Sequence, residues 1–153
     1  MDFGTAIRKA QEVEDIAAAV YIVLAERSAG GPAEAAMFRR LEQEEREHAK
    51  RLQMLGSMYL KDPRSFRSVD LEIENIDAIV AEAREFYLAV KRGAFDAATT
   101  VARMVDLEER FAVTHAETVA RNADPGVKTL FTMLASQDRE HAKLLRTRGL
   151  APT

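Results

Sequence analysis

Apolar residues recur every three or four positions along almost the whole chain, and this spacing restricts the fold more than any other feature. No sustained alternation of apolar and polar residues marks a strand. Four clusters of helix-breaking residues interrupt the pattern: Gly30-Gly31-Pro32, Lys61-Asp62-Pro63, Arg92-Gly93 and the segment from Asn122 to Gly126. The sequence therefore predicts an all-α fold with helices at about residues 2 to 29, 33 to 60, 72 to 91, 95 to 122 and 126 to 147.

The connections between the predicted helices indicate how they pack. A short turn joins the first pair and another joins the last pair, whereas about 35 residues containing the shortest helix separate the two pairs. Short turns form antiparallel hairpins, and a single long connection is typical of a ferritin-like four-helix bundle rather than of an up-down-up-down bundle. The length of 153 residues is that of one domain, and we expect residues 1–153 to form it.

The composition excludes several kinds of site and partner. Because the chain contains no cysteine, it has no disulfide, zinc–thiolate site, iron–sulfur cluster or thiol nucleophile, and nitrogen and oxygen atoms must hold any metal. A net charge of −3 with scattered basic residues argues against a nucleic-acid partner. The longest apolar run, Ile16 to Ala25, is about half the length that crosses a bilayer. With no signal peptide visible, we expect a cytoplasmic protein with no membrane partner.

Each of the four long helices carries one acidic residue in the middle of its apolar stripe. Glu14, Glu45, Glu108 and Asp138 each share a helix face with apolar side chains three, four or seven positions away. A buried carboxylate normally protonates, pairs with a cationic group or binds a metal, and these stripes contain no lysine or arginine. The sequence therefore predicts a metal site inside the bundle.

A histidine follows two of these acidic residues on the next helical turn. Glu45 with His48 forms a Glu-x-x-His pair, and Asp138 with His141 forms an Asp-x-x-His pair. This spacing puts the acid and the imidazole on one helix face, where both can reach one ion. Two such pairs and two further carboxylates are typical of dinuclear iron or manganese sites in bundle cores. Four carboxylates also balance the charge of two divalent ions.

An internal repeat relates the two halves of the predicted site. The segment from Leu41 to Leu52 aligns with the segment from Leu134 to Leu145 at an offset of 93 residues. An offset of 94 residues aligns the first helix with the helix at 95 to 122 and places Tyr21 over His115. We interpret this as a duplicated helix hairpin. Tyr21 and His115 are then either partners of the ligating residues or ordinary core side chains.

Over its whole length the chain resembles the rubrerythrin branch of the ferritin-like superfamily. The resemblance is carried by Glu14 with Tyr21, the stretch from Glu44 to Ala49, Glu108, and the stretch from Asp138 to Ala142. It implies a diiron centre, in which Glu45 and Asp138 bridge the two iron ions. The ligands that it implies are Glu14, Glu45, His48, Glu108, Asp138 and His141.

The sequence departs from the family pattern in three respects. The rubredoxin-type centre of rubrerythrins needs four cysteines, and this chain has none, so electrons would come from an external donor protein. The additional glutamate usually found one turn from the ligand on the third long helix is replaced by apolar residues, which leaves the six-ligand set. Asp138 stands where glutamate is usual, and its shorter side chain reaches about 1.5 Å less far, which matters at ligand distances.

The resemblance implies an oxidoreductase whose two iron ions react with dioxygen or hydrogen peroxide. Manganese or zinc can substitute for iron at a site of this composition. We expect a homodimer, because such helix pairs commonly bury remaining apolar surface against a second subunit. Three alternatives stay open at this point: a ferroxidase or iron-handling protein, a diiron hydroxylase acting on an organic substrate, and a metal-free helical interaction module.

Overall fold

The computed structural model describes residues 1–70 and 75–148, and all regular secondary structure in these ranges is helical. The elements are α1 (Phe3–Glu26), α2 (Pro32–Lys61), the short 3-10 helix η1 (Pro63–Phe66), α3 (Ile76–Lys91), α4 (Ala97–Arg121) and α5 (Pro125–Arg148). The all-α prediction is confirmed. Except for the start of the third helix, every predicted boundary lies within three residues of the observed one. The predicted helical residues 72 to 74 and the C-terminal residues 149 to 153 lie outside the described residues.

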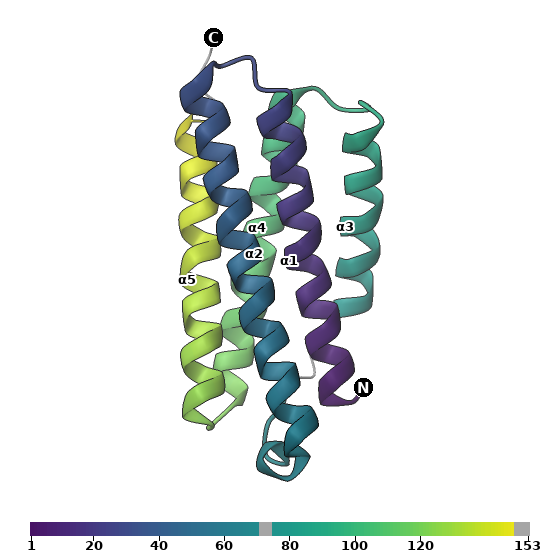
Figure 1. The fold of residues 1–153 in the computed structure, drawn as a ribbon, viewed down its shortest axis with the longest axis vertical. Helices are drawn as coiled ribbons and strands as arrows, with labels where there is room; N and C mark the ends of the chain where they lie inside the picture. Colours follow the sequence, from purple (N-terminus) through teal and green to yellow (C-terminus); the bar gives the residue numbers. More distant parts are fainter. Residues whose placement is uncertain (71–74, 149–153) are drawn as a thin grey trace.

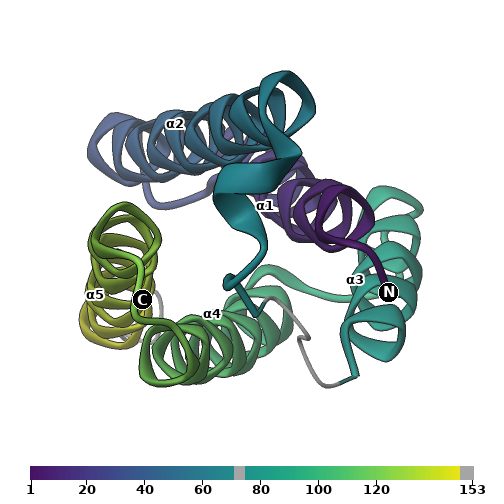
Figure 2. The ribbon, with the colours of Figure 1, turned by 90° about the horizontal axis from the view of Figure 1, so that it is seen from below.

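The four long helices form a bundle of two antiparallel hairpins (Figure 1). α1 packs against α2, and α4 packs against α5. α3 lies against α1 on the outside of the bundle, as the view along the helices shows (Figure 2). Because α3 carries the chain back along the length of the bundle, α2 and α4 run in the same direction. No described helix is long and apolar enough to span a bilayer.

The turn between the first two helices is closed by the carboxylate of Glu34. This carboxylate accepts hydrogen bonds from the hydroxyl of Ser28 and, at 2.8 Å, from the backbone N–H of Gly30. Gly31 follows with a φ of 85°, a conformation that glycine adopts at little cost. These contacts hold residues 28 to 31 in a turn, which explains why α1 ends at Glu26, three residues before its predicted end.

Side-chain caps start both helices of the second hairpin. Asp96 accepts the backbone N–H of Thr99 at 2.7 Å at the start of α4. Asp124 accepts the backbone N–H of Val127 at 2.9 Å at the start of α5. Each cap satisfies a backbone donor that the helix itself leaves free.

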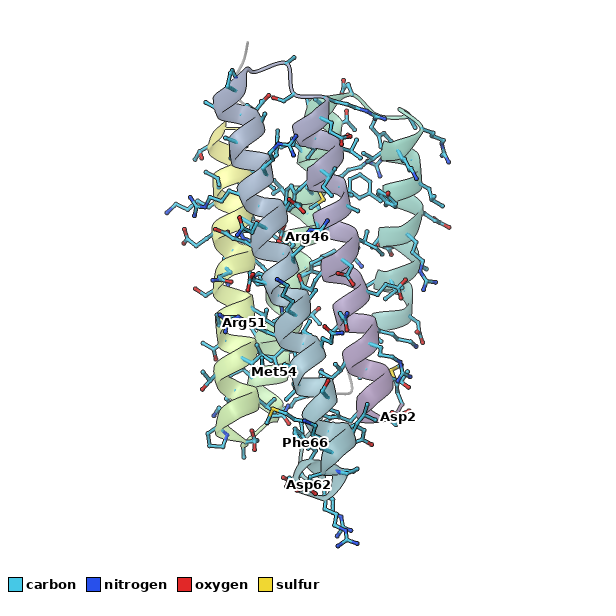
Figure 3. All side chains as sticks on the ribbon, viewed as in Figure 1. Asp2, Arg46, Arg51, Met54, Asp62 and Phe66 are labelled. Atoms are coloured by element: carbon cyan, nitrogen blue, oxygen red, sulfur yellow. The ribbon has the colours of Figure 1, made fainter. Side chains whose placement is uncertain are left out.

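The core contains large apolar side chains and, among them, the acidic residues that the sequence singled out. Leu41, Met104 and Phe131 are fully buried. The apolar spacing also predicts burial of Met54 and Met58, and this prediction is wrong, because their exposed fractions are 64% and 53%. Met54 lies in the C-terminal half of α2 (Figure 3).

Candidate metal centre

Acidic and histidine side chains from all four long helices meet in the core of the bundle. None of the eight predicted site residues is more than 4% exposed, and the four acidic side chains are completely buried. The structure brings all eight of them together: Glu14 and Tyr21 from α1, Glu45 and His48 from α2, Glu108 and His115 from α4, and Asp138 and His141 from α5.

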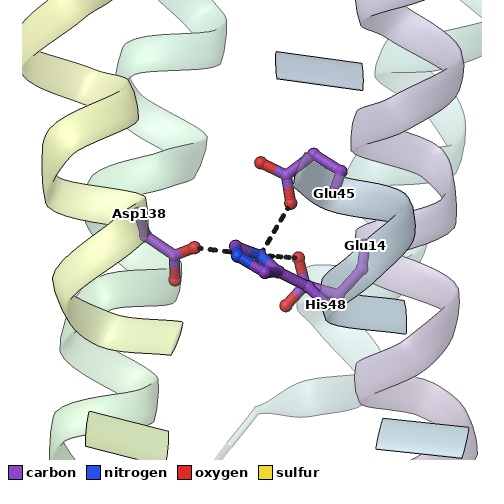
Figure 4. A group of neighbouring side chains, drawn as sticks. All are labelled: Glu14, Glu45, His48 and Asp138. Atoms are coloured by element: carbon purple, nitrogen blue, oxygen red, sulfur yellow. Dashed lines mark hydrogen bonds and ion pairs between the residues drawn. The ribbon is translucent and has the colours of Figure 1, made fainter. Parts of the chain in front are cut away.

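Six of these side chains form two overlapping groups, and within each group the ligand atoms lie within 4.8 Å of one another. Group one consists of Glu14, Glu45, His48 and Asp138 (Figure 4). Group two consists of Glu45, Glu108, Asp138 and His141. Both groups contain Glu45 and Asp138, so each group could hold a metal ion and the two sites would share these carboxylates. His115 belongs to neither group.

The two imidazoles of the groups turn the same ring atom toward the carboxylates. His48 Nδ1 lies 3.1 Å from Glu45 Oε2 and 3.5 Å from Glu14 Oε2. His141 Nδ1 lies 2.6 Å from Glu45 Oε1 and 3.6 Å from Glu108 Oε1. The rings are stacked with centroids 5.6 Å apart. Glu45 therefore faces one histidine with each oxygen, as a carboxylate between two metal positions would.

The outward nitrogen of each imidazole contacts a residue of the opposite hairpin. His48 Nε2 is hydrogen-bonded to Gln137 Oε1, and His141 Nε2 lies 2.8 Å from Glu44 Oε2. Once the ring is neutral, an acceptor at Nε2 favours the tautomer that carries its proton there, which would leave the Nδ1 lone pair for a metal.

The role of Gln137 and Glu44 was not predicted from the sequence. Both lie on helix faces with exposed or half-buried residues. The internal repeat could have identified them, because each immediately precedes a shared acidic residue and the two are 93 positions apart.

Tyr21 and His115 contact carboxylates and are therefore not simply core residues. The Tyr21 hydroxyl donates a hydrogen bond to Glu108 Oε1. His115 Nδ1 lies 2.8 Å from Asp138 Oδ2, and its Nε2 lies 3.6 Å from Glu14 Oε1. Both residues thus contact the acidic residues from outside the two groups.

Several buried polar atoms of the groups have no hydrogen-bond partner, which provides a test of whether a metal fits. In the part of the chain that the structure describes, these atoms are Glu14 Oε1 and Oε2, Glu45 Oε1, Glu108 Oε2, Asp138 Oδ1 and His141 Nδ1, of which Glu45 Oε1 and His141 Nδ1 form an ion pair with each other at 2.6 Å. All six belong to groups one and two. A buried polar atom without a partner costs about 1–3 kcal/mol, so this donor set fits a bound cation better than a metal-free core.

The charged groups of the centre shift one another's pKa values. Burial acts to raise the pKa of Glu14, but its interactions with His48 and His115 outweigh burial and lower it to about 2. Burial raises the pKa of Asp138 to about 6 and holds that of Glu45 well above its usual range.

The two imidazoles of the groups show the opposite balance. Burial acts to lower the pKa of His48 and of His141, but the facing carboxylates raise these values to about 11 and about 12. The metal-free centre therefore holds protons at neutral pH that a metal would have to displace.

Comparisons with known proteins give no relative: no family profile matches the chain, and no match is found among curated proteins or solved structures. The resemblance to rubrerythrins stays a prediction. The two groups of buried ligand atoms remain the basis for a functional proposal.

Proposed function

We propose that this protein is a ferritin-like, dinuclear metal-carboxylate protein that reduces hydrogen peroxide or dioxygen through two iron ions, with electrons from an external donor. The observation that carries the proposal is that two groups of buried ligand atoms share Glu45 and Asp138. A carboxylate shared between adjacent sites is what a dinuclear centre requires. The partnerless buried atoms of both groups support the same proposal.

Each side chain has a defined place in the proposed centre. Glu14 and His48 would hold the first ion, and Glu108 and His141 would hold the second. Glu45 and Asp138 would contact both. The four carboxylates neutralise two divalent ions, and oxygen with imidazole nitrogen suits iron or manganese.

The protein's own residues would position the ligands and exclude water. Iron, when bound, supplies one-electron oxidation and reduction, and two ions together supply the two electrons that convert hydrogen peroxide and two protons into two water molecules. Gln137 and Glu44 orient the histidine rings through their outward nitrogens. Tyr21 holds the carboxylate of Glu108. Complete burial of the four acids keeps bulk water from the ligand atoms, which strengthens their electrostatic interactions with a cation.

The proposal is tested by loading the protein with ferrous iron without oxygen and then adding hydrogen peroxide or dioxygen. We expect about one peroxide to be consumed for every two ferrous ions, and repeated turnover when a reductant is supplied. Glu45→Ala should abolish this reaction, because it removes a ligand from both positions. Glu47→Ala on the exposed face of the same helix is the matched control and should react normally.

Two results would contradict the proposal. The first is ferrous oxidation no faster with the protein than in buffer. The second is accumulation of ferric iron far beyond two ions per chain without turnover of peroxide, which would favour the iron-handling alternative.

A further inference from the structure

Two positions related by the internal repeat carry different residues. Tyr21 follows Glu14 by two helical turns on α1, and His115 follows Glu108 by two turns on α4. Both side chains are buried, and each contacts an acidic residue of the opposite hairpin. The duplicated scaffold therefore places a phenol and an imidazole in corresponding positions beside the centre.

Tyr21 acts on a single carboxylate. Its hydroxyl donates to Glu108 Oε1, and it is the only hydrogen-bond donor that the described residues provide to that side chain. Glu108 Oε2 has no hydrogen-bond partner. Glu108 belongs to group two only. Tyr21 thus fixes one oxygen of this carboxylate and leaves the other for a metal.

His115 acts on Glu14, which belongs to group one only, and on Asp138, which belongs to both groups. With Asp138 ionised, His115 Nδ1–H donates to Asp138 Oδ2, and the Nε2 edge of the ring faces Glu14 Oε1 at 3.6 Å. The Phe131 ring packs against the imidazole with centroids 5.5 Å apart, which restrains its orientation. Asp138 Oδ1 has no hydrogen-bond partner and lies 3.8 Å from His48 Nδ1.

Asp138 therefore differs from its repeat counterpart Glu45. Glu45 turns one oxygen to each histidine of the groups, whereas Asp138 has Oδ2 engaged by His115 and offers Oδ1 to the cluster. The two halves of the centre are thus supported in different ways, although their ligand sets correspond.

Resting on the dinuclear centre proposed above, we propose that Tyr21 and His115 are positioning residues that support the two metal positions unequally. Tyr21 supports the second position through Glu108. His115 supports the first position through Glu14 and both positions through the shared Asp138. The first ion then depends on His115 alone of these two residues, whereas the second ion depends on both.

Manganese titration of the full chain tests this division, with the electron paramagnetic resonance signal of free Mn²⁺ as the readout. We expect His115→Leu to weaken binding of both ions, the first by about 10- to 100-fold, the usual effect of losing a partner of a ligand. Tyr21→Phe should weaken only the second ion, by a similar factor.

Ligand variants show which ion is affected. In a His48→Ala background, which removes the first position, Tyr21→Phe should still weaken the remaining ion, and His115→Leu should also weaken it through Asp138. In a His141→Ala background, His115→Leu should weaken the remaining ion and Tyr21→Phe should change its affinity only slightly. This is a double-mutant cycle between each positioning residue and each position.

A conservative variant separates positioning from simple packing. Asparagine can place an N–H near the position of His115 Nδ1, so His115→Asn should restore most of the affinity that His115→Leu loses. The inference is overturned if Tyr21→Phe weakens both ions equally, if either substitution has no effect, or if His115→Asn weakens binding as much as His115→Leu. If the parent protein binds neither manganese nor iron, both this inference and the proposed function fail. If the parent and the variants all bind two ions equally well, only this inference is overturned.

Discussion

His48 and His141 each hold a proton at the atom that a metal would need. Facing carboxylates raise the pKa of His48 to about 11 and that of His141 to about 12, so both rings are cationic in the metal-free protein at neutral pH. A metal ligand must be a neutral imidazole. Metal affinity and protonation are therefore linked at the level of single residues.

We accordingly expect divalent metal binding near pH 7 to release a proton from each of these histidines. Affinity should rise with pH, because every displaced proton becomes easier to remove as the solution becomes less acidic. Calorimetric titrations in buffers of different ionisation enthalpy measure the number released. A binding heat that does not depend on the buffer would show that the imidazoles are not deprotonated on binding.

The acceptors behind the two histidines differ in charge, and this difference leads to a second prediction. His141 faces the carboxylate of Glu44, whereas His48 faces the neutral amide of Gln137. Glu44→Gln should weaken the ion held by His141 by about 10-fold, because an anionic acceptor makes the imidazole a stronger ligand. Mn²⁺ titration measures the effect, with Glu42→Gln on the same helix as the control. Equal Mn²⁺ affinities in the two variants would show that Glu44 does not strengthen His141 as a ligand.

The acidic ligand candidates could be predicted from the sequence, but their outer partners could not. An acidic residue within an apolar stripe is anomalous in a single helix, so Glu14 and Glu108 are visible without a structure. Glu44 and Gln137 follow the polar pattern of an ordinary helix surface. Their role depends on contacts across the two hairpins, which helical periodicity does not contain.

At the scale of the elements, the N-terminal caps of the second hairpin define where α4 and α5 begin. We expect Asp124→Ala to reduce the free energy of unfolding by about 1 kcal/mol, because Val127 N–H loses its acceptor. Asp124→Asn keeps an acceptor oxygen and should cost much less. Urea denaturation followed by circular dichroism measures both changes.

This substitution should leave the metal content unchanged, since Asp124 lies about four helical turns before Asp138. A large loss of metal in Asp124→Ala would mean that the start of α5 positions the centre directly.

The helices were predicted well because glycine and proline clusters interrupt a continuous apolar pattern. The prediction was less accurate where side chains decide the boundary, as in the turn that Glu34 closes. The apolar spacing also does not specify that α3 packs against α1, because the apolar stripe of α3 could pack equally well against the stripe of another helix. A cationic side chain also helps to hold α3 in place: the Arg27 guanidinium donates hydrogen bonds to the backbone carbonyls of Val90 and Lys91 at the end of α3.

At the scale of the whole molecule, two hairpins close around a charged centre that neither hairpin contains alone. Group one draws ligands from α1, α2 and α5, and group two draws them from α2, α4 and α5. Metal bound at both groups would therefore join the two hairpins, and its binding free energy would add to the stability of the folded chain.

The measurement that tests the central claim most directly is the metal content per chain, determined by mass spectrometry on protein produced with iron available. We expect about two iron ions per chain in the parent protein. Glu45→Ala should lose most of this metal, because Glu45 belongs to both groups, and Glu47→Ala should retain it. Metal at background level in the parent, with no uptake of added ferrous iron, would contradict the dinuclear centre and favour a metal-free helical module.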